Sequence, residues 1–196
     1  MSADRFDDVV TQSVFFRETG PQNTDRTLQA AKHRADELGI RTILVATTEG
    51  ETGVRAAQVF SGYDLTVVTH STGFAQPNVQ ELTSANRAAI ERAGARILTA
   101  QHAFGGVNRA VRRKLATHEL DEIIAHTLRI FGQGAKVCVE ISMMAADAGL
   151  VRAGEPCIAI AGTGRGADTA LVVVPVNAQD FFDMRVMEVL AKPRLA

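Results

Sequence analysis

The chain alternates short apolar runs with amphipathic segments, and few folds accommodate that order. Strands are predicted at residues 13–16, 42–47, 65–69 and 96–99, and helical spacing of apolar residues fills the intervals between them. Because strands that alternate with helices form a parallel sheet covered on both faces, the sequence predicts an α/β fold. We expect the loops after the second, third and fourth strands to lie at the carboxyl edge, where ligands of such folds bind.

The rest of the chain adds helices and a final pair of strands. A helix is expected from about residue 79 to 93, and a buried one over 137–150, where apolar residues keep helical spacing. Two strongly apolar strands follow at 156–161 and 169–174. The loop between them is too short for a helical crossover, so they should form an antiparallel hairpin. No repeat or linker interrupts the chain, and we expect a single domain over residues 1–196.

Composition excludes several classes of protein. Hydrophobic residues make up 46% of the 196 residues and the net charge is −1, which is typical of a globular protein without a nucleic-acid surface. No apolar run approaches the ~20 residues that cross a bilayer, and the N-terminal MSADRFDDVV has no apolar segment of a signal peptide. Cys138 and Cys157 sit inside apolar runs as reduced, buried thiols. We therefore expect a cytoplasmic protein.

The loop over residues 47–53 has the residue types that hold a phosphate. It joins a predicted strand to a predicted helix, and the first turn of a helix offers unpaired backbone N–H groups and a partial positive charge. Glycines let the backbone approach an anion closely, and hydroxyl groups add donors. The candidate phosphate-binding residues are Thr47, Thr48, Gly50, Thr52 and Gly53.

This loop is similar to the phosphate loop of flavodoxins, with Glu49 where a threonine is usual. Glu49 and Glu51 would repel an anion unless they point away or pair with Arg55. The alternative is a tight strand-to-helix turn whose small residues serve packing alone.

Two further loops carry candidate binding residues. In the loop between the last two strands, an arginine can make a bidentate contact with a phosphate, and the glycines can form an anion-binding backbone nest. Alternatively it is a long hairpin turn in which Asp168 bonds its own backbone. After the third strand, a histidine and a phenylalanine can face an aromatic ring, or lie in a solvated loop with the phenylalanine in the core. The candidates are Gly164, Arg165, Gly166 and Thr169 in the first loop, and His70, Thr72, Gly73 and Phe74 in the second.

His70 and His102 are also candidates for acid–base chemistry. Both histidines and Glu140 are residue types that can hold a metal, but no pair of them has the i, i+4 spacing of a helical metal site, so no metal is expected. The apolar flanks of Cys138 raise a thiol's pKa and argue against nucleophilic catalysis. The basic run at 109–114 is most simply a solvated helix face, with attraction of anionic ligands as an alternative role.

The second half of the chain resembles the end of the pyruvate kinase C-terminal domain, where a helix, a Gly-Leu-Val turn and a strand lead to a glycine-rich loop. The closer resemblance is to a family of stand-alone, largely uncharacterised proteins of archaea and bacteria that are pyruvate kinase C-terminal-like. The segments that carry it are THSTGF (69–74), QHAFGG (101–106), VNRAVRRKL (107–115), FGQGAKVCVEISMMAADAG (131–149), GRGADTA (164–170) and FFD (181–183).

The resemblance implies a three-layer α/β sandwich with a mostly parallel sheet and a C-terminal antiparallel hairpin. It does not imply pyruvate kinase activity, because that enzyme's catalytic site lies in a barrel domain which this chain is too short to contain. Members of the stand-alone family are associated with bound flavin mononucleotide (FMN). This chain departs from the family at Gly162-Thr163, where a serine-rich start is usual, and at Ala116-Thr117, where Gly-Gly is frequent.

Three hypotheses follow. In the first, the protein is a flavoprotein that binds a phosphorylated aromatic ligand, FMN above others. In the second, it is a flavin-dependent or sugar-phosphate enzyme that uses His70 or His102. In the third, it is a regulatory module that binds a sugar bisphosphate and signals to a partner. A homo-oligomer is expected from the apolar C-terminal run and from the frequency of symmetric assembly.

Overall fold

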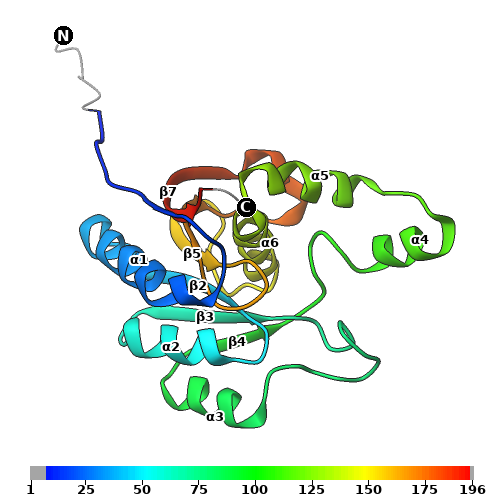
Figure 1. The fold of residues 1–196 in the computed structure, drawn as a ribbon, viewed down its shortest axis with the longest axis horizontal. Helices are drawn as coiled ribbons and strands as arrows, with labels where there is room; N and C mark the ends of the chain where they lie inside the picture. The colour runs from blue at the N-terminus through cyan, green and yellow to red at the C-terminus, as the bar shows by residue number, and fades with distance from the viewer. Residues whose placement is uncertain (1–7, 195–196) are drawn as a thin grey trace.

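In the computed structural model, which describes residues 8–194, a seven-stranded sheet is covered by helices on both faces (Figure 1). The sheet order is β1-β7-β6-β5-β2-β3-β4. The strands are β1 (Val14–Phe16), β2 (Thr42–Thr47), β3 (Asp64–Thr69), β4 (Arg96–Thr99), β5 (Cys157–Ala161), β6 (Thr169–Val174) and β7 (Arg185–Pro193). The helices are α1 (Thr24–Leu38), α2 (Glu51–Val59), α3 (Ser84–Arg92), α4 (Val107–Leu115), α5 (Leu120–Leu128) and α6 (Gln133–Asp147), with 3-10 turns η1 (Pro21–Asn23), η2 (Arg129–Phe131) and η3 (Ala178–Asp183).

The sheet is mostly parallel, as predicted. β2 pairs in parallel with β3 and β5, β3 pairs in parallel with β4, and β5 and β6 form the predicted antiparallel hairpin. β7 was not predicted: it pairs antiparallel with β6 and parallel with β1, and so joins the N-terminal strand to the sheet.

Alternate residues of the central strands fill two separate cores. In β2, Ile43 and Val45 point into the core under α1 and α2, whereas Leu44 points into the core under α6. In β5, Ile158 and Ile160 join the first core and Ala159 joins the second. Both faces of these strands are therefore buried, which explains their continuous apolar runs and produces the three-layer sandwich.

The helix predicted over 79–93 begins later, and the early part of that prediction is wrong. α3 starts at Ser84 because the Thr83 side chain accepts a hydrogen bond from the Asn86 N–H at 3.2 Å and caps the helix. The backbone N–H of Thr83 donates to the carbonyl of Glu49 at 3.2 Å. This contact with another loop sets the start of α3, and apolar spacing alone could not reveal it.

The predicted buried helix over 137–150 is present and starts earlier, at Gln133. In contrast, α4 has no buried residue and extends away from the sheet, at the right of Figure 1. None of the helices within residues 8–194 is long and apolar enough to span a bilayer. Most of the N-terminal stretch that was read for a signal peptide lies outside the described residues.

Candidate functional site

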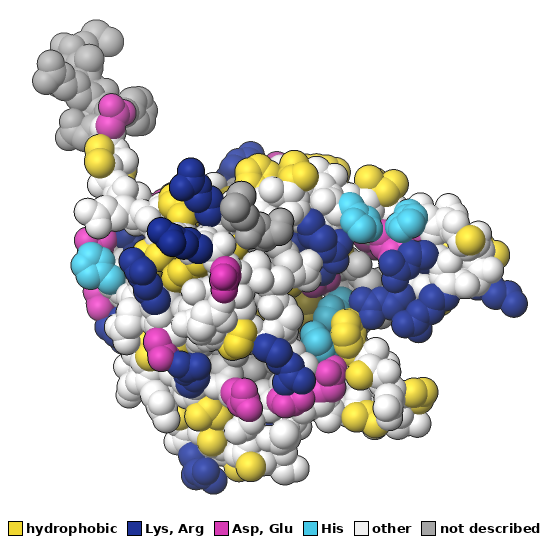
Figure 2. Space-filling view, viewed as in Figure 1, with side chains coloured by type: hydrophobic (Ala, Val, Ile, Leu, Met, Phe, Trp, Pro, Cys, Tyr) yellow, Lys and Arg dark blue, Asp and Glu magenta, His cyan; other side chains and the backbone are white. Residues whose placement is uncertain are grey.

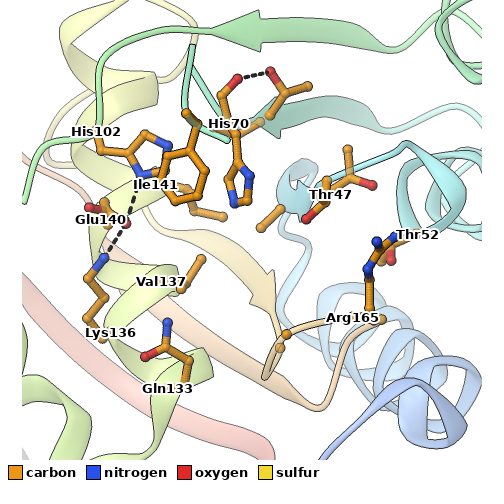
Figure 3. A pocket seen from close by; sticks show the side chains of 18 of the residues that line it. Thr47, Thr52, His70, His102, Gln133, Lys136, Val137, Glu140, Ile141 and Arg165 are labelled. Atoms are coloured by element: carbon orange, nitrogen blue, oxygen red, sulfur yellow. Dashed lines mark hydrogen bonds and ion pairs between the residues drawn. The ribbon is translucent and has the colours of Figure 1, made fainter. Parts of the chain in front are cut away.

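The carboxyl edge of the sheet holds a cavity of about 260 Å³, called the main cavity below. The loops after β2, β3 and β5 form one side of it, and the first half of α6 forms the other (Figure 3). Because these three strands run parallel, their carboxyl ends meet at one edge, as the sequence predicts.

The structure brings many of the predicted binding residues to the main cavity. Those that line it are Thr47, Thr48, Thr52, His70, Phe74, Gly164, Arg165 and Gly166. The loop after β2, the loop after β3 and the β5–β6 loop thus contribute to one shared space.

Other predicted residues do not line the main cavity. A side chain at Gly50 would come within 2.4 Å of Asn86 Cβ, and one at Gly53 within 2.8 Å of a Val67 methyl. Close packing, the alternative considered for this loop, therefore accounts for both glycines. Thr169 is buried and donates to Asp168 Oδ1 at 2.9 Å, while Thr72 and Gly73 are exposed on the loop after β3.

Asp168 organises the β5–β6 loop from inside the protein. Its fully buried carboxylate accepts hydrogen bonds from the backbone N–H groups of Gly20 at 3.1 Å and Thr163 at 3.2 Å. The bond to Thr163 is the local contact expected of a hairpin turn, whereas the bond to Gly20 ties the loop to a distant segment. Asp168 thus fixes the loop that carries Arg165.

Charge pairing differs from the sequence-based expectation for the phosphate loop. Glu49 pairs with Arg165 at 2.7 Å, and Arg55 pairs with Asp25 instead of either glutamate of the loop. The hydrogen bond from Arg165 lowers the pKa of Glu49 below its ordinary value. This ion pair joins the loop after β2 to the β5–β6 loop. It also offsets part of the repulsion that Glu49 would exert on an anion.

His70 is held by a carboxylate that the sequence analysis missed. Its Nδ1 lies 2.8 Å from Glu81 Oε2, and the Gln80 side chain donates to the His70 carbonyl at 2.9 Å. The Phe74 ring stacks on His70, with centroids 4.0 Å apart. Gln80 and Glu81 fall within the predicted helix 79–93, but they lie in the loop before α3. This loop, which the sequence pattern did not predict, brings both side chains to His70.

The floor of the main cavity carries a buried ion pair on α6. Lys136 Nζ lies 2.5 Å from Glu140 Oε2, the two side chains are 8% and 4% exposed, and Glu140 Oε1 accepts the Phe104 N–H at 3.1 Å. His102 Nδ1 lies 3.7 Å from the same Glu140 carboxylate. Burial raises the pKa of Glu140, but the contacts with His102 and Lys136 outweigh it and bring the pKa to about 2. Burial also lowers the pKa of Lys136.

The sequence carried one signal for this pair: Lys136 and Glu140 stand four residues apart in an otherwise apolar helix. Otherwise, Glu140 stands out from the sequence only as a possible metal ligand with His70 and His102. In residues 8–194, no group of three or more histidine, cysteine, aspartate or glutamate side chains is arranged to hold a metal ion. Burial raises the pKa of Cys138, in agreement with the inert thiol predicted for it, and raises that of Cys157 to about 12.

Comparison with known proteins identifies the domain type. A family model described as "Pyruvate kinase, alpha/beta domain" matches residues 25–173. Among solved structures, Cryptosporidium parvum pyruvate kinase in complex with ADP aligns at 12% identity with a TM-score of 0.38. The alignment covers 85% of this chain and 23% of the kinase chain, so this chain spans about a quarter of that enzyme's length.

Proposed function

The chain belongs to the pyruvate kinase alpha/beta domain family, and from this premise we propose that its main cavity binds a small phosphorylated ligand, with FMN as the first candidate. The observation that carries the proposal is the meeting of two small-residue loops at one cavity. The loop after β2 contributes Thr47 and Thr52, and the β5–β6 loop contributes Arg165 (Figure 3).

The phosphate would lie between these two loops. Thr52 stands in the first turn of α2, where backbone N–H groups and the helix dipole favour an anion, and the Arg165 guanidinium offers a bidentate contact. Glu49 would release Arg165 or share it with the phosphate, since both side chains are largely exposed at the rim.

The ring of the ligand would lie near His70 and Phe74. At about 260 Å³ the main cavity is slightly smaller than the ~300–1,000 Å³ typical of ligand pockets. Phe74 occupies space beside both histidines, stacked on His70 at 4.0 Å and on His102 at 4.9 Å. We propose that an entering flavin ring stacks against Phe74 or takes its place.

Binding of FMN and of riboflavin, which lacks the phosphate, tests the proposal. Purified protein would show a flavin spectrum or quench the fluorescence of added FMN, and riboflavin would bind much more weakly. Arg165→Gln and Thr52→Val should lower the affinity for FMN and leave the affinity for riboflavin unchanged, because each substitution removes a contact with the phosphate alone. Equal affinity for the two flavins would exclude the phosphate site. A sugar bisphosphate that raises the melting temperature where FMN does not would replace FMN as the ligand.

A second candidate function, an enzyme, is favoured by the geometry of His70. When Nδ1–H donates to Glu81, the Nε2 atom is left unprotonated as an acceptor beside the main cavity, the arrangement of a general base oriented by a carboxylate. His102 is less suited, because its Nδ1 faces Glu140 and its Nε2 accepts the Ser71 N–H at 3.4 Å.

Turnover would be sought with NADH as electron donor in the presence of FMN, and separately with phosphorylated sugars. In an enzyme of this kind His70→Ala keeps ligand affinity and loses turnover, whereas Glu81→Gln displaces the pH–rate profile. A His70→Ala variant with full turnover would remove this candidate.

A further inference from the structure

A second concave site lies on the far side of Phe74, between the loop after β3 and the first turns of α4. This α4 hollow has a volume of about 450 Å³. Three cationic side chains line it, Arg109, Arg113 and Lys114, together with the polar side chains of Ser71 and Gln101. Figure 2 shows the concentration of Lys and Arg side chains over this part of the surface.

The lining of the α4 hollow includes no aspartate or glutamate. In the main cavity, by comparison, Arg165 pairs with Glu49 and Lys136 with Glu140. On α4 itself, Arg112 forms an ion pair with Glu122 of α5, with 3.1 Å between Arg112 Nε and Glu122 Oε1. Among residues 8–194, none of the three cations of the hollow forms an ion pair with a carboxylate. Their positive charge is therefore available to a ligand.

The shape of the hollow depends on a glycine at the start of α4. Gly106 has φ of 68°, and a Cβ atom there would lie 2.2 Å from the Gln101 side-chain nitrogen. A larger residue would displace Gln101 from the hollow or move the first turn of α4. Glycine suits the positive φ at this point and leaves room for Gln101, which lines the hollow beside the α4 cations.

A shared wall separates the hollow from the main cavity. Phe74, His102 and Arg109 line both spaces. The Phe74 and His102 rings are stacked at 4.9 Å, and the Arg109 guanidinium lies 4.5 Å from the Phe74 centroid. A molecule in the hollow would therefore be a neighbour of the ligand in the main cavity and would contact the opposite side of this wall.

We propose that the α4 hollow binds the phosphoryl group of a second small molecule, distinct from the ligand of the main cavity. Arginine and lysine together suit a phosphoryl group, which accepts several charge-assisted hydrogen bonds at once. The identity of the neighbouring ligand rests on the proposed function, whereas the anion site itself stands on the charges and shape of the hollow. Its occupant would be a phosphorylated co-substrate or effector positioned beside Phe74.

Calorimetric titration with pyrophosphate tests the site. An Arg113→Gln/Lys114→Gln double variant should bind pyrophosphate roughly tenfold more weakly or worse, because two of three charge-assisted contacts are lost. Arg17→Gln/Arg26→Gln, which removes two exposed charges that line neither cavity, is the matched control and should bind as the unchanged protein does. All titrations are repeated in an Arg165→Gln background, so that any pyrophosphate in the main cavity is counted separately.

Unchanged pyrophosphate affinity in the double variant would overturn the proposal, and so would an equal loss in Arg17→Gln/Arg26→Gln, which would indicate attraction by general charge. In a third experiment the protein is saturated with FMN before pyrophosphate is added. Pyrophosphate that binds while FMN stays bound supports two distinct sites, whereas pyrophosphate that displaces FMN one for one refutes them. If FMN does not bind at all, the proposed function fails, and the pyrophosphate titrations still decide the α4 hollow.

Discussion

The two cavities at the carboxyl edge of the sheet differ in how their charged groups are partnered. Two ion pairs lie around the main cavity, Glu49 with Arg165 and Lys136 with Glu140, and the fully buried Asp168 of the β5–β6 loop accepts backbone N–H groups. Along α4 no residue is buried, and the cations of the α4 hollow have no carboxylate beside them. Much of the charge on the first side therefore has a partner within the protein, whereas the cations on the second side have no carboxylate partner among the described residues.

The largest effect is expected from removal of the Asp168 carboxylate. Asp168→Ala leaves the buried N–H of Gly20 and the partly buried N–H of Thr163 without acceptors, and should lower the free energy of unfolding by about 3 kcal/mol or more. Asp168→Asn keeps the shape of the side chain and one acceptor oxygen, so it should lower the free energy of unfolding by less. Urea unfolding measures both. A loss below about 1 kcal/mol in the alanine variant would show that the loop does not depend on this carboxylate.

The Glu140 carboxylate should make stability depend on pH in the acid range. Its pKa in the folded protein is about 2, below its ordinary value of 4.5, so its stabilising contribution is complete above pH 4.5 and is lost as the pH falls toward 2. The loss corresponds to about 3 kcal/mol. The free energy of unfolding, measured at several pH values across this range, should fall more steeply with decreasing pH in the unchanged protein than in Glu140→Gln. The same pH dependence in both proteins would contradict a lowered pKa of Glu140.

The sign of the stability change on Gly134→Ala tests how closely α6 packs against the β5–β6 loop. An exposed Gly→Ala change inside a helix stabilises by about 1 kcal/mol. Here the added Cβ would lie 2.2 Å from Thr169 Oγ1, so Gly134→Ala should instead destabilise by about 2 kcal/mol. Thermal unfolding decides, and a raised melting temperature would mean that α6 is not tightly packed against the β5–β6 loop.

The smallest effect on stability is expected on α4. Arg113 and Lys114 are exposed and without carboxylate partners in residues 8–194, so Arg113→Gln/Lys114→Gln should change the free energy of unfolding by less than about 0.5 kcal/mol. The same double variant should bind pyrophosphate roughly tenfold more weakly or worse. A clear loss of stability would place these cations among the structural charges and remove the contrast between the two cavities.

Much of the architecture was readable from local patterns. The alternation of strands and helices predicts the parallel sheet and the edge where its loops meet, and the short connection at 162–168 predicts the β5–β6 hairpin. These features depend on hydrophobic periodicity and on turn residues, which act over a few neighbours in the chain. The segments that resemble the pyruvate kinase C-terminal domain predicted the family in the same direct way.

The charges of the site were decided by tertiary structure. Glu49 pairs with Arg165 across 116 residues of sequence, and Asp168 receives the N–H of Gly20 across 148. β7 enters the sheet between β1 and β6, and no strand is predicted there from the sequence. Local periodicity records whether a side chain is buried, but it does not record which distant group it meets. The sequence by itself thus determined the scaffold and the edge where its loops meet, and only the folded chain decided which charges are paired there and which have no carboxylate beside them.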